Sequence, residues 1–508
     1  MPSSFKTFCA PSGSLRSGWR LALFLLGTGA LSALALPPVN FFPILVLTLP
    51  VLFQSAQDAP GFWRAALRGF LFGMGLHIAG LYWLTNAILT RVHEYWWAVP
   101  LAAPGVSLII APLIAIPAVL CRIVPPGWCR IFMFAGCWTL ADMSRVFIFS
   151  GFPWNPLGSA LELPGLAGDV LMQPASLIGV DGLTAFLVLA SLAFWQGRRG
   201  KIIVLSGSMF WCMAGGWLFM HPHYSQVSNP VLVLVQGNVP EKEVLGHDDA
   251  VRQFRSYLAL TQQGVEKART LFSRRPIVVV WPESAFPGLL DEDEWARRAI
   301  AQAAEGAMSL IGSDRRAQHR WYNSLEAIDA DGEVRAIYDK SRLVPFGEYQ
   351  PSIIPFNILP EVITAGDGLK TWDFPETGRV GPMVCYEIIF SGKVVASHDR
   401  PNWLLTISND AWYGYSAGPY QHLATGRMRA VEEGLPVVFA NNRGVSALYD
   451  ARGHEIARTK WDTEQLITSI IPFPKGRTLF SLCGKSIPVF LSLFMIVVAF
   501  ICKLKKYL

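Results

Sequence analysis

The sequence predicts two structural parts, a bundle of membrane-spanning helices and a layered α/β domain. Of the 508 residues, 52% are hydrophobic and only 16% are charged, whereas a soluble globular domain carries about 25% charged residues. The apolar residues gather near both ends of the chain in stretches long enough to cross a membrane. Between them, over residues 228–474, the composition is that of an ordinary globular domain.

Eight apolar segments are expected to form transmembrane helices, each of which needs about 17–25 mostly apolar residues. They are residues 20–36, 41–53, 66–84, 99–119, 131–149, 175–195, 202–220 and 487–502. The second is short, and the fifth contains Asp142 and Arg145, so these two are the weaker predictions. The first segment ends in "ALALPP" like a signal peptide, but the further spans favour an uncleaved helix.

Lysine and arginine are distributed as expected for a chain whose N-terminus is cytoplasmic. The segments expected inside contain Lys6, Arg16, Arg20, Arg64, Arg68, Arg122, Arg130, Arg198, Arg199, Lys201, Lys503, Lys505 and Lys506. The segments expected outside contain Arg91 beside Glu94, and Glu162 with Asp169. We therefore expect a membrane domain of seven helices over 1–222, an outer domain over 228–474, and a final helix with a cytoplasmic tail over 485–508. The net charge of +6 reflects orientation, so no nucleic-acid partner is expected.

Few ionisable residues lie inside the expected spans. Asp142 and Arg145 stand three positions apart on one helix face, where a local structural pair is favoured over catalysis. His77 is expected to be a helix–helix contact. The segment 151–158, "GFPWNPLG", is rich in turn formers and aromatic residues and is expected to be an ordered outer loop.

The outer region alternates short apolar runs with polar helical stretches. Continuous apolar runs are typical of strands that are covered on both faces. Strands are expected at 231–236, 277–281, 308–312, 335–339, 380–385, 403–407 and 436–442, and helices at 251–272 and 424–433. This alternation predicts a layered α/β domain.

Three chemically capable residues follow expected strands, where sites of α/β domains tend to lie. They are Glu283 in "WPESAFPG", Lys340 before "SRLVPFGEY", and Cys385, the one cysteine between residues 221 and 480. Each residue alone also has an ordinary explanation. Glu283 could be a carboxylate at a helix N-terminus, Lys340 a solvated lysine, and Cys385 a buried thiol of the core. A lone thiol in this region cannot form a disulfide within it.

The three residue types belong together chemically. A free thiol is mostly protonated at neutral pH, and a neighbouring carboxylate can accept its proton and return it to a leaving group. An ammonium group and a backbone N–H can stabilise the oxyanion that forms when the sulfur attacks a carbonyl carbon. This combination is typical of acyl transfer through a covalent intermediate.

Many ordered stretches resemble one known family. They are "FPWNPLG", "VQGNVP", "WPESAFP", "YDKSRLVPFGEY", "GPMVCYEIIF", "SNDAWYG", "QHLATGRMRAVE" and "ANNRGVS". These motifs resemble those of the nitrilase (carbon–nitrogen hydrolase) superfamily. The expected transmembrane helices around them narrow the resemblance to the apolipoprotein N-acyltransferase family. The resemblance implies an α-β-β-α sandwich on eight transmembrane helices, in a bacterial inner membrane, with a periplasmic catalytic domain and both termini cytoplasmic.

The resemblance also implies roles for the three residues. Cys385 would take an acyl chain from a phospholipid as a thioester and pass it to the N-terminal amine of a diacylated apolipoprotein. Glu283 would be the base, and Lys340 would stabilise the oxyanion. Glu348 would support Lys340 or proton transfer.

At other positions this chain either matches the family's sequence pattern or departs from it. Tyr386 and Glu387 match residues that the family needs beside the nucleophile, and we expect them to contact substrate. Family members often carry Lys-Trp shortly after the "QGN.P" stretch, whereas this chain has Val244-Leu245. Any substrate contact by that tryptophan is therefore absent here or made by another aromatic residue.

A lipid substrate requires the site to reach the membrane, because each CH₂ taken out of the bilayer costs about 0.8 kcal/mol. The segment 349–363, "YQPSIIPFNILPEVI", is apolar and broken by prolines. We expect a mobile arm that places Ile353, Ile354 and Phe356 in the interface, against the alternative of an ordinary packed loop.

The expected partners are a phospholipid donor, with phosphatidylethanolamine the expected headgroup, a diacylated apolipoprotein, and membrane lipids. We expect no metal or organic cofactor and a monomeric enzyme. A membrane-anchored amidase is the first alternative, and it would differ by using water as acceptor. A non-catalytic lipid-binding protein is disfavoured by the intact triad, and a transporter by the lack of paired repeats.

Overall fold

The computed structural model describes residues 18–89, 92–221, 229–240, 246–273, 275–351, 362–396 and 399–504. Within these ranges the chain divides into two compact units. The described parts of Met1–His221, Tyr415–Ala424 and Leu479–Leu508 form the first, which we call the membrane unit. The described parts of Pro222–Gly414 and Thr425–Thr478 form the second, the α/β unit. A short internal segment, Tyr415–Ala424, thus belongs to the membrane unit.

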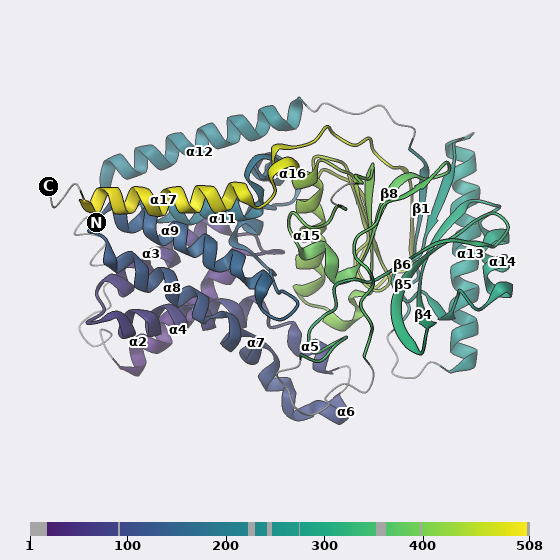
Figure 1. The fold of residues 1–508 in the computed structure, drawn as a ribbon, viewed down its shortest axis with the longest axis horizontal. Helices are drawn as coiled ribbons and strands as arrows, with labels where there is room; N and C mark the ends of the chain where they lie inside the picture. The colour runs from purple at the N-terminus through teal and green to yellow at the C-terminus, as the bar shows by residue number, and fades with distance from the viewer. Residues whose placement is uncertain are drawn as a thin grey trace. The chain divides into compact units, whose positions relative to one another are not determined.

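The membrane unit is built from helices (Figure 1). They are α2 (Trp19–Ser32), α3 (Leu45–Gln57), α4 (Phe62–Gly80), α5 (Leu84–Leu89), α6 (Val92–Tyr95), α7 (Ala102–Ile110), α8 (Pro112–Leu120), α9 (Trp128–Met143), α10 (Gly165–Met172), α11 (Ala175–Ala193), α12 (Gly197–Met220), α16 (Leu479–Cys483) and α17 (Ser486–Leu504).

Four stretches of the described residues are long and apolar enough to cross a membrane. They are Trp96–Ile123, Ala175–Ala193, Gly197–Met220 and Ser486–Leu504. The other expected spans overlap helices α2, α3, α4 and α9, which are shorter or less apolar. The chain is a membrane protein with several apolar helices.

Glycines allow the central helix α4 to pack closely against α2. A Cβ atom on Gly29 of α2 would lie 2.0 Å from the carbonyl oxygen of Phe72, and one on Gly75 of α4 would lie 1.9 Å from that of Leu26. Small residues are typical of helix contacts in membranes because they let the backbones approach. These two positions therefore bring α2 and α4 into backbone contact.

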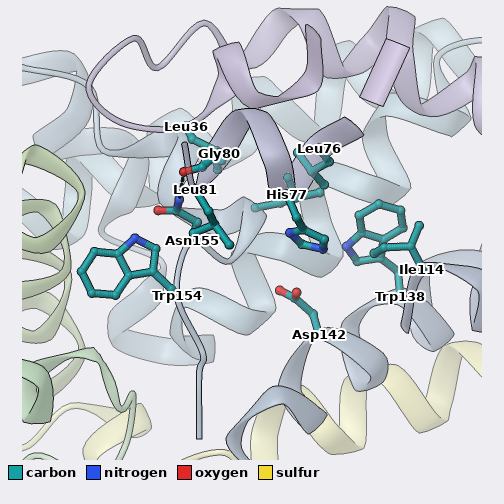
Figure 2. A pocket seen from close by; sticks show the side chains of 11 residues that line it. Leu36, Leu76, His77, Gly80, Leu81, Ile114, Trp138, Asp142, Trp154 and Asn155 are labelled. Carbon is teal, nitrogen blue, oxygen red and sulfur yellow. Dashed lines mark hydrogen bonds between the residues drawn. The ribbon is translucent and has the colours of Figure 1, made fainter. Parts of the chain in front are cut away.

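The ionisable pair predicted in the fifth span is confirmed. Arg145 Nη2 and Asp142 Oδ1 lie 2.6 Å apart, and both side chains are buried. Arg145 also donates to the carbonyl oxygen of Trp154, so the pair helps to hold the loop 151–158. Figure 2 shows Asp142 close to His77 of α4, at the wall of a cavity of about 10 Å³. His77 is buried there, as expected for a helix–helix contact.

The α/β unit contains two β-sheets (Figure 1). The first has the order β13-β1-β2-β4-β5-β6, with β3 paired to β4, and the second the order β12-β11-β10-β9-β8-β7. The strands are β1 (Val231–Gln236), β2 (Ile277–Val280), β3 (Phe286–Leu289), β4 (Met308–Ala317), β5 (Arg320–Ile328), β6 (Val334–Asp339), β7 (Trp372–Phe374), β8 (Gly378–Val384), β9 (Trp403–Ser408), β10 (Val437–Asn441), β11 (Ala447–Tyr449), β12 (Glu455–Arg458) and β13 (Gln465–Ile470).

Alternate residues of the central strands enter two different cores. In β1, Leu232 and Leu234 join the core between the sheets, while Val233 faces the core beneath helix α13 (His247–Leu271). Helix α14 (Glu294–Ala303) covers the same outer face. On the second sheet, Gly426 of helix α15 (Gly418–Glu433) lies against Phe439 of β10. The layered α/β domain that the sequence predicted, and the α-β-β-α sandwich that the resemblance implied, are confirmed.

Strand direction gathers the chemically capable residues at common edges of the two sheets. Strands β1, β2 and β4 are parallel, and two antiparallel pairings place β6 parallel to them. Strands β8, β9 and β10 are likewise parallel. The residues that follow β2 and β6 therefore share one edge, and those that follow β8, β9 and β10 share another.

Candidate active site

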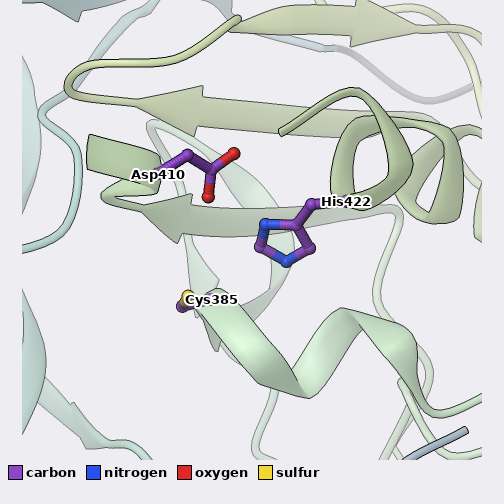
Figure 3. A group of neighbouring side chains, drawn as sticks. All are labelled: Cys385, Asp410 and His422. Atoms are coloured by element: carbon purple, nitrogen blue, oxygen red, sulfur yellow. The ribbon is translucent and has the colours of Figure 1, made fainter. Parts of the chain in front are cut away.

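Cys385 stands at a sharp turn immediately after β8. Its φ of 51° lies in the left-handed region, which costs free energy for a residue with a side chain and persists where surrounding contacts impose it. The chain continues from it into the short helix η8 (Cys385–Ile389). Figure 3 shows Cys385 at the start of this turn, with Asp410 from the end of β9 nearby. The sulfur lies 3.4 Å from Ser408 Oγ, within hydrogen-bond distance.

Glu387 stabilises this turn through hydrogen bonds accepted by its carboxylate. Its Oε2 accepts from the backbone N–H of Val384 at 2.8 Å. Its Oε1 accepts from Tyr338 Oη at 2.8 Å and from the N–H of Ser341 at 2.9 Å. The side chain is 1% exposed, so its carboxylate meets donors of this chain. The turn that carries Cys385 is thereby tied to the end of β6.

Glu283 is held in one orientation after β2. Its Oε1 accepts from Asn323 Nδ2 at 2.6 Å, and its Oε2 accepts from the backbone N–H of Asn409 at 2.8 Å. Lys340 Nζ lies 3.7 Å from Oε1. Asn323 lies on β5 and Asn409 follows β9, so both sheets fix this carboxylate.

Lys340 follows β6 and pairs most closely with Glu348. Its Nζ lies 2.6 Å from Glu348 Oε1, while Glu348 Oε2 accepts from the N–H of Val344 at 2.8 Å. The lysine side chain is 1% exposed. The two carboxylates of Glu283 and Glu348 therefore face one buried ammonium group.

Burial and charge set the protonation states of the site. Burial raises the pKa of Glu283 above its ordinary value, and the Lys340 charge offsets part of that rise. Burial opposes the charge of Lys340, but the carboxylates of Glu348 and Glu283 raise its pKa above the usual value. Burial, and then the charge of Glu283, raise the pKa of the Cys385 thiol well above its usual value. In the resting site the thiol is protonated and the lysine is charged.

A second set of polar residues supports the Cys385 side of the site. Ser408 Oγ donates to Asp410 Oδ1 at 2.7 Å, and Asn441 Nδ2 donates to Asp410 Oδ2 at 2.6 Å. Sequence reasoning assigned no role to these residues, or to Asn323. Ser408, Asp410 and Asn441 lie in the stretches "SNDAWYG" and "ANNRGVS", which resemble the family. That resemblance was the one sequence feature that could have pointed to them. Asn323 lies in a strand with no such stretch.

The remaining predicted site residues fall into two groups. Tyr386 is buried, its ring packs edge-on against Phe390 with centroids 5.4 Å apart, and burial raises its pKa. Ile353, Ile354, Phe356 and the pair Val244-Leu245 lie outside the described residues.

The ends of the expected arm are described and lie beside Glu348. The N–H of Phe346 donates to the carbonyl oxygen of Tyr349 at 2.9 Å, and the N–H of Ile363 donates to that of Glu348 at 2.9 Å. Tyr349 and Ile363 therefore lie next to Glu348, whose carboxylate pairs with Lys340.

The arrangement suits nucleophilic acyl transfer. A buried thiol, a carboxylate fixed by two donors and an ammonium group meet where strands of both sheets end. Burial strengthens their mutual electrostatic effects, because the local dielectric constant is low. A thiol beside a carboxylate and an ammonium group has the chemistry to form a covalent acyl intermediate.

Known protein families match both parts of the chain. The family described as carbon–nitrogen hydrolase matches residues 250–479. The family described as apolipoprotein N-acyltransferase N-terminal domain matches residues 28–193. Fold and site thus define a carbon–nitrogen hydrolase domain attached to a membrane part.

Relatives similar over nearly the whole chain narrow this class. The apolipoprotein N-acyltransferase of Allorhizobium ampelinum is 34% identical over 481 residues, which are 89% of each chain. That of Rhodopseudomonas palustris is 34% identical over 500 residues, 92% of each chain. That of Bradyrhizobium diazoefficiens is 33% identical over 504 residues, 92% of each chain. The chain belongs to the apolipoprotein N-acyltransferase family.

Proposed function

We propose that this protein transfers an acyl chain from a phospholipid to the N-terminal amine of the diacylglyceryl-cysteine of apolipoproteins, through a thioester on Cys385. The observation that carries the proposal is the meeting of Cys385, Glu283 and Lys340 in one buried site. Family membership supports the choice of acyl donor and amine acceptor.

The first step forms the acyl-enzyme. The protonated Cys385 thiol gives its proton to Glu283 as sulfur attacks the ester carbonyl carbon of the phospholipid. Lys340 and the backbone N–H of Tyr386 stabilise the resulting oxyanion. When the intermediate collapses, the C–O bond breaks and the lysophospholipid oxygen takes the proton back from Glu283. A thioester remains on Cys385.

The second step repeats the chemistry with an amine. The free N-terminal amine of the diacylated apolipoprotein attacks the thioester carbonyl, and Glu283 accepts a proton from it. The C–S bond breaks, the sulfur of Cys385 regains a proton, and the acyl chain leaves as an amide. Glu283 thus serves as base and then acid in both steps.

The neighbouring residues keep these groups in place. The Asn323 and Asn409 donors direct the Glu283 carboxylate, and Glu348 holds the Lys340 ammonium group. We propose that Tyr386 contributes its N–H to the oxyanion, and that Glu387 acts by positioning the Cys385 turn.

The membrane arrangement is proposed as follows. Eight helices span a bacterial inner membrane, seven in residues 1–222 and one in 485–508. The catalytic domain, residues 228–474, is periplasmic, and both termini are cytoplasmic. Ile353, Ile354 and Phe356 reach the bilayer interface from the segment anchored beside Glu348. The donor carries an ethanolamine headgroup, and the acceptor is a diacylated apolipoprotein.

Intact-protein mass spectrometry of the full-length enzyme tests the two steps. After incubation with phosphatidylethanolamine in mixed micelles, wild type is expected to gain one acyl chain, mapped to Cys385. Adding a diacylated lipopeptide with a free amine is expected to remove the adduct and yield triacylated peptide. C385A is expected to form no adduct, while C212A, which removes an exposed cysteine of α12, retains it.

Two results would contradict the proposal. Transfer by C385A at the wild-type rate would exclude the thioester. Loss of the adduct to water at the same rate with and without the lipopeptide amine would identify a hydrolase, which uses water as acceptor as the amidase alternative would. An N-acetylated lipopeptide serves as the control acceptor, since it has no free amine.

A further inference from the structure

An apolar groove in the membrane unit lies outside the chemistry described above. Its cavity volume is about 370 Å³, and helices α9, α11 and α12 line it. The lining residues are Trp128, Phe132, Phe186, Leu189, Ala190, Ala193, Ile203, Val204 and Gly207. None of them carries a charged or nucleophilic side chain. The groove is far larger than a site for one water and falls in the size range of ligand pockets.

Along its second half, α12 packs closely against its neighbours. There the Trp211 ring stacks on Phe186 with centroids 4.0 Å apart, and Trp211 Nε1 donates to the carbonyl oxygen of Leu171 at 2.9 Å. Gly215 approaches so closely that a Cβ atom would lie 2.2 Å from the Val170 oxygen. In the first half of α12, Gly200 makes a similar approach, since a Cβ atom there would lie 2.1 Å from the Ala193 oxygen at the end of α11. The groove-lining residues of α12, which are Ile203, Val204 and Gly207, lie between these two close contacts.

At Gly207, which lines the groove, there is unfilled space beside α12. A Cβ atom added there would meet nothing within 4 Å. Only 6% of the apolar window of this helix is buried inside the protein. In a bilayer such a gap is filled by lipid chains, because an empty void forfeits dispersion contacts on every wall.

The start of the same helix is basic. Arg198, Arg199 and Lys201 are exposed in its first turns, and Ile203, which lines the groove, follows two residues after Lys201. Lys201 Nζ lies 5.4 Å above the Phe194 ring. Within the described part of the chain, Arg198 and Arg199 have no carboxylate within ion-pair distance. Basic clusters beside helix grooves are suited to phosphate headgroups.

We propose that this groove binds one acyl chain of an anionic phospholipid whose headgroup lies against Arg198, Arg199 and Lys201. Groove and charges lie along adjacent turns of one helix, so a single lipid can engage both. The lipid is a structural ligand that holds the first half of α12 to α9 and α11. It is not a reacting substrate here, because the lining residues carry no nucleophile, acid or base.

Native mass spectrometry of the full-length protein tests the site, with phosphatidylglycerol and phosphatidylcholine of the same chain lengths as probes. Wild type is expected to retain phosphatidylglycerol with at least about tenfold preference, given three basic residues at the headgroup. G207L is expected to lose this lipid because the leucine side chain enters the groove. The matched control G216L adds the same side chain to α12 at another open position and is expected to bind as wild type.

A triple variant, R198Q/R199Q/K201Q, separates the contribution of the basic residues to lipid binding from that of the apolar groove. It is expected to lose the preference for phosphatidylglycerol and to bind both lipids equally. This variant keeps the test decisive if G207L does not fold. Equal retention of the two lipids by wild type, or equal retention of phosphatidylglycerol by G207L and G216L, would overturn the proposal.

Discussion

At the scale of single residues, one carboxylate stabilises the strained backbone at Cys385, the proposed nucleophile. Cys385 adopts a left-handed conformation, and Glu387 accepts hydrogen bonds from Val384 on one side and from Tyr338 and Ser341 on the other. A glutamine at 387 would replace one acceptor oxygen by an NH₂ group that faces donors. The turn would then lose part of what holds it.

We expect E387Q to lower the rate of acyl-enzyme formation by about 100-fold, because misplacing a reacting atom by 1 Å costs that much. Single-turnover mass spectrometry on phosphatidylethanolamine measures this rate. The KM for lipopeptide is expected to change little, which separates positioning from substrate binding. The control E333Q alters an exposed glutamate and should react as wild type. A wild-type rate for E387Q would contradict the positioning role.

We expect the pH dependence of the rate to follow the ionisation of Glu283, the proposed base. Burial raises its pKa, so the base becomes protonated as the pH falls through a value above the ordinary 4.5. The hydrogen bond from Asn323 lowers that pKa. N323A should therefore move the acid limb of the kcat/KM profile to higher pH. A limb that stays in place, or moves to lower pH, would refute this account.

At the scale of elements, the strands differ in how clearly the sequence marks them. Strands β1, β8 and β9 are buried on both faces and were predicted from continuous apolar runs. Strand β5 was not predicted, because its first residues are exposed and polar residues interrupt its apolar ones. It nevertheless places Asn323 against Glu283, the proposed base. Pairing with β4 and β6 decides its conformation, and such pairing is invisible in a local pattern.

Strand β5 also contains a buried acid, Glu326, whose Oε1 accepts from Ser313 Oγ at 2.9 Å while its Oε2 has no hydrogen-bond partner. Burial raises the pKa of Glu326 to about 7. The folded chain therefore binds its proton more tightly than the unfolded chain. The stability that this carboxyl contributes is fully present below pH 4.5 and is lost as the pH rises through about 7.

E326Q is accordingly expected to stabilise the protein at pH 8, where ionised Glu326 costs roughly 3 kcal/mol, at about 1.4 kcal/mol per pKa unit. At pH 5 the variant and wild type should melt at similar temperatures. Thermal unfolding at the two pH values measures the difference. A shift in Tm of the same size at both values would show that ionisation of Glu326 is not the cause.

At the scale of the whole molecule, one segment that follows β9 and precedes β10 in the sequence belongs to the membrane unit. Gln421, in the segment Tyr415–Ala424, accepts hydrogen bonds at its Oε1 from Trp83 Nε1, Trp154 Nε1 and Asn155 Nδ2, each at 2.9 Å. This one buried amide oxygen joins Trp83, in the turn after α4, to the loop 151–158.

Q421L is expected to leave three donors without this acceptor. Each buried donor left unsatisfied costs about 1–3 kcal/mol, so a large fall in Tm of the full-length protein is expected. The control Q302L changes an exposed glutamine of α14 and should melt as wild type. An unchanged Tm for Q421L would mean that other groups satisfy these donors.

The sequence by itself determined the apolar helical segments, the central strands and the three residues of the proposed triad. These are local properties, since burial leaves periodic apolar runs and catalytic residues follow strand ends. Only the tertiary structure decided which residues hold the triad, among them Asn323, Ser408 and Asp410. It also decided that Tyr415–Ala424 joins the membrane unit and that α12 leaves an apolar groove. These features depend on contacts between segments far apart in the chain, which local periodicity does not encode.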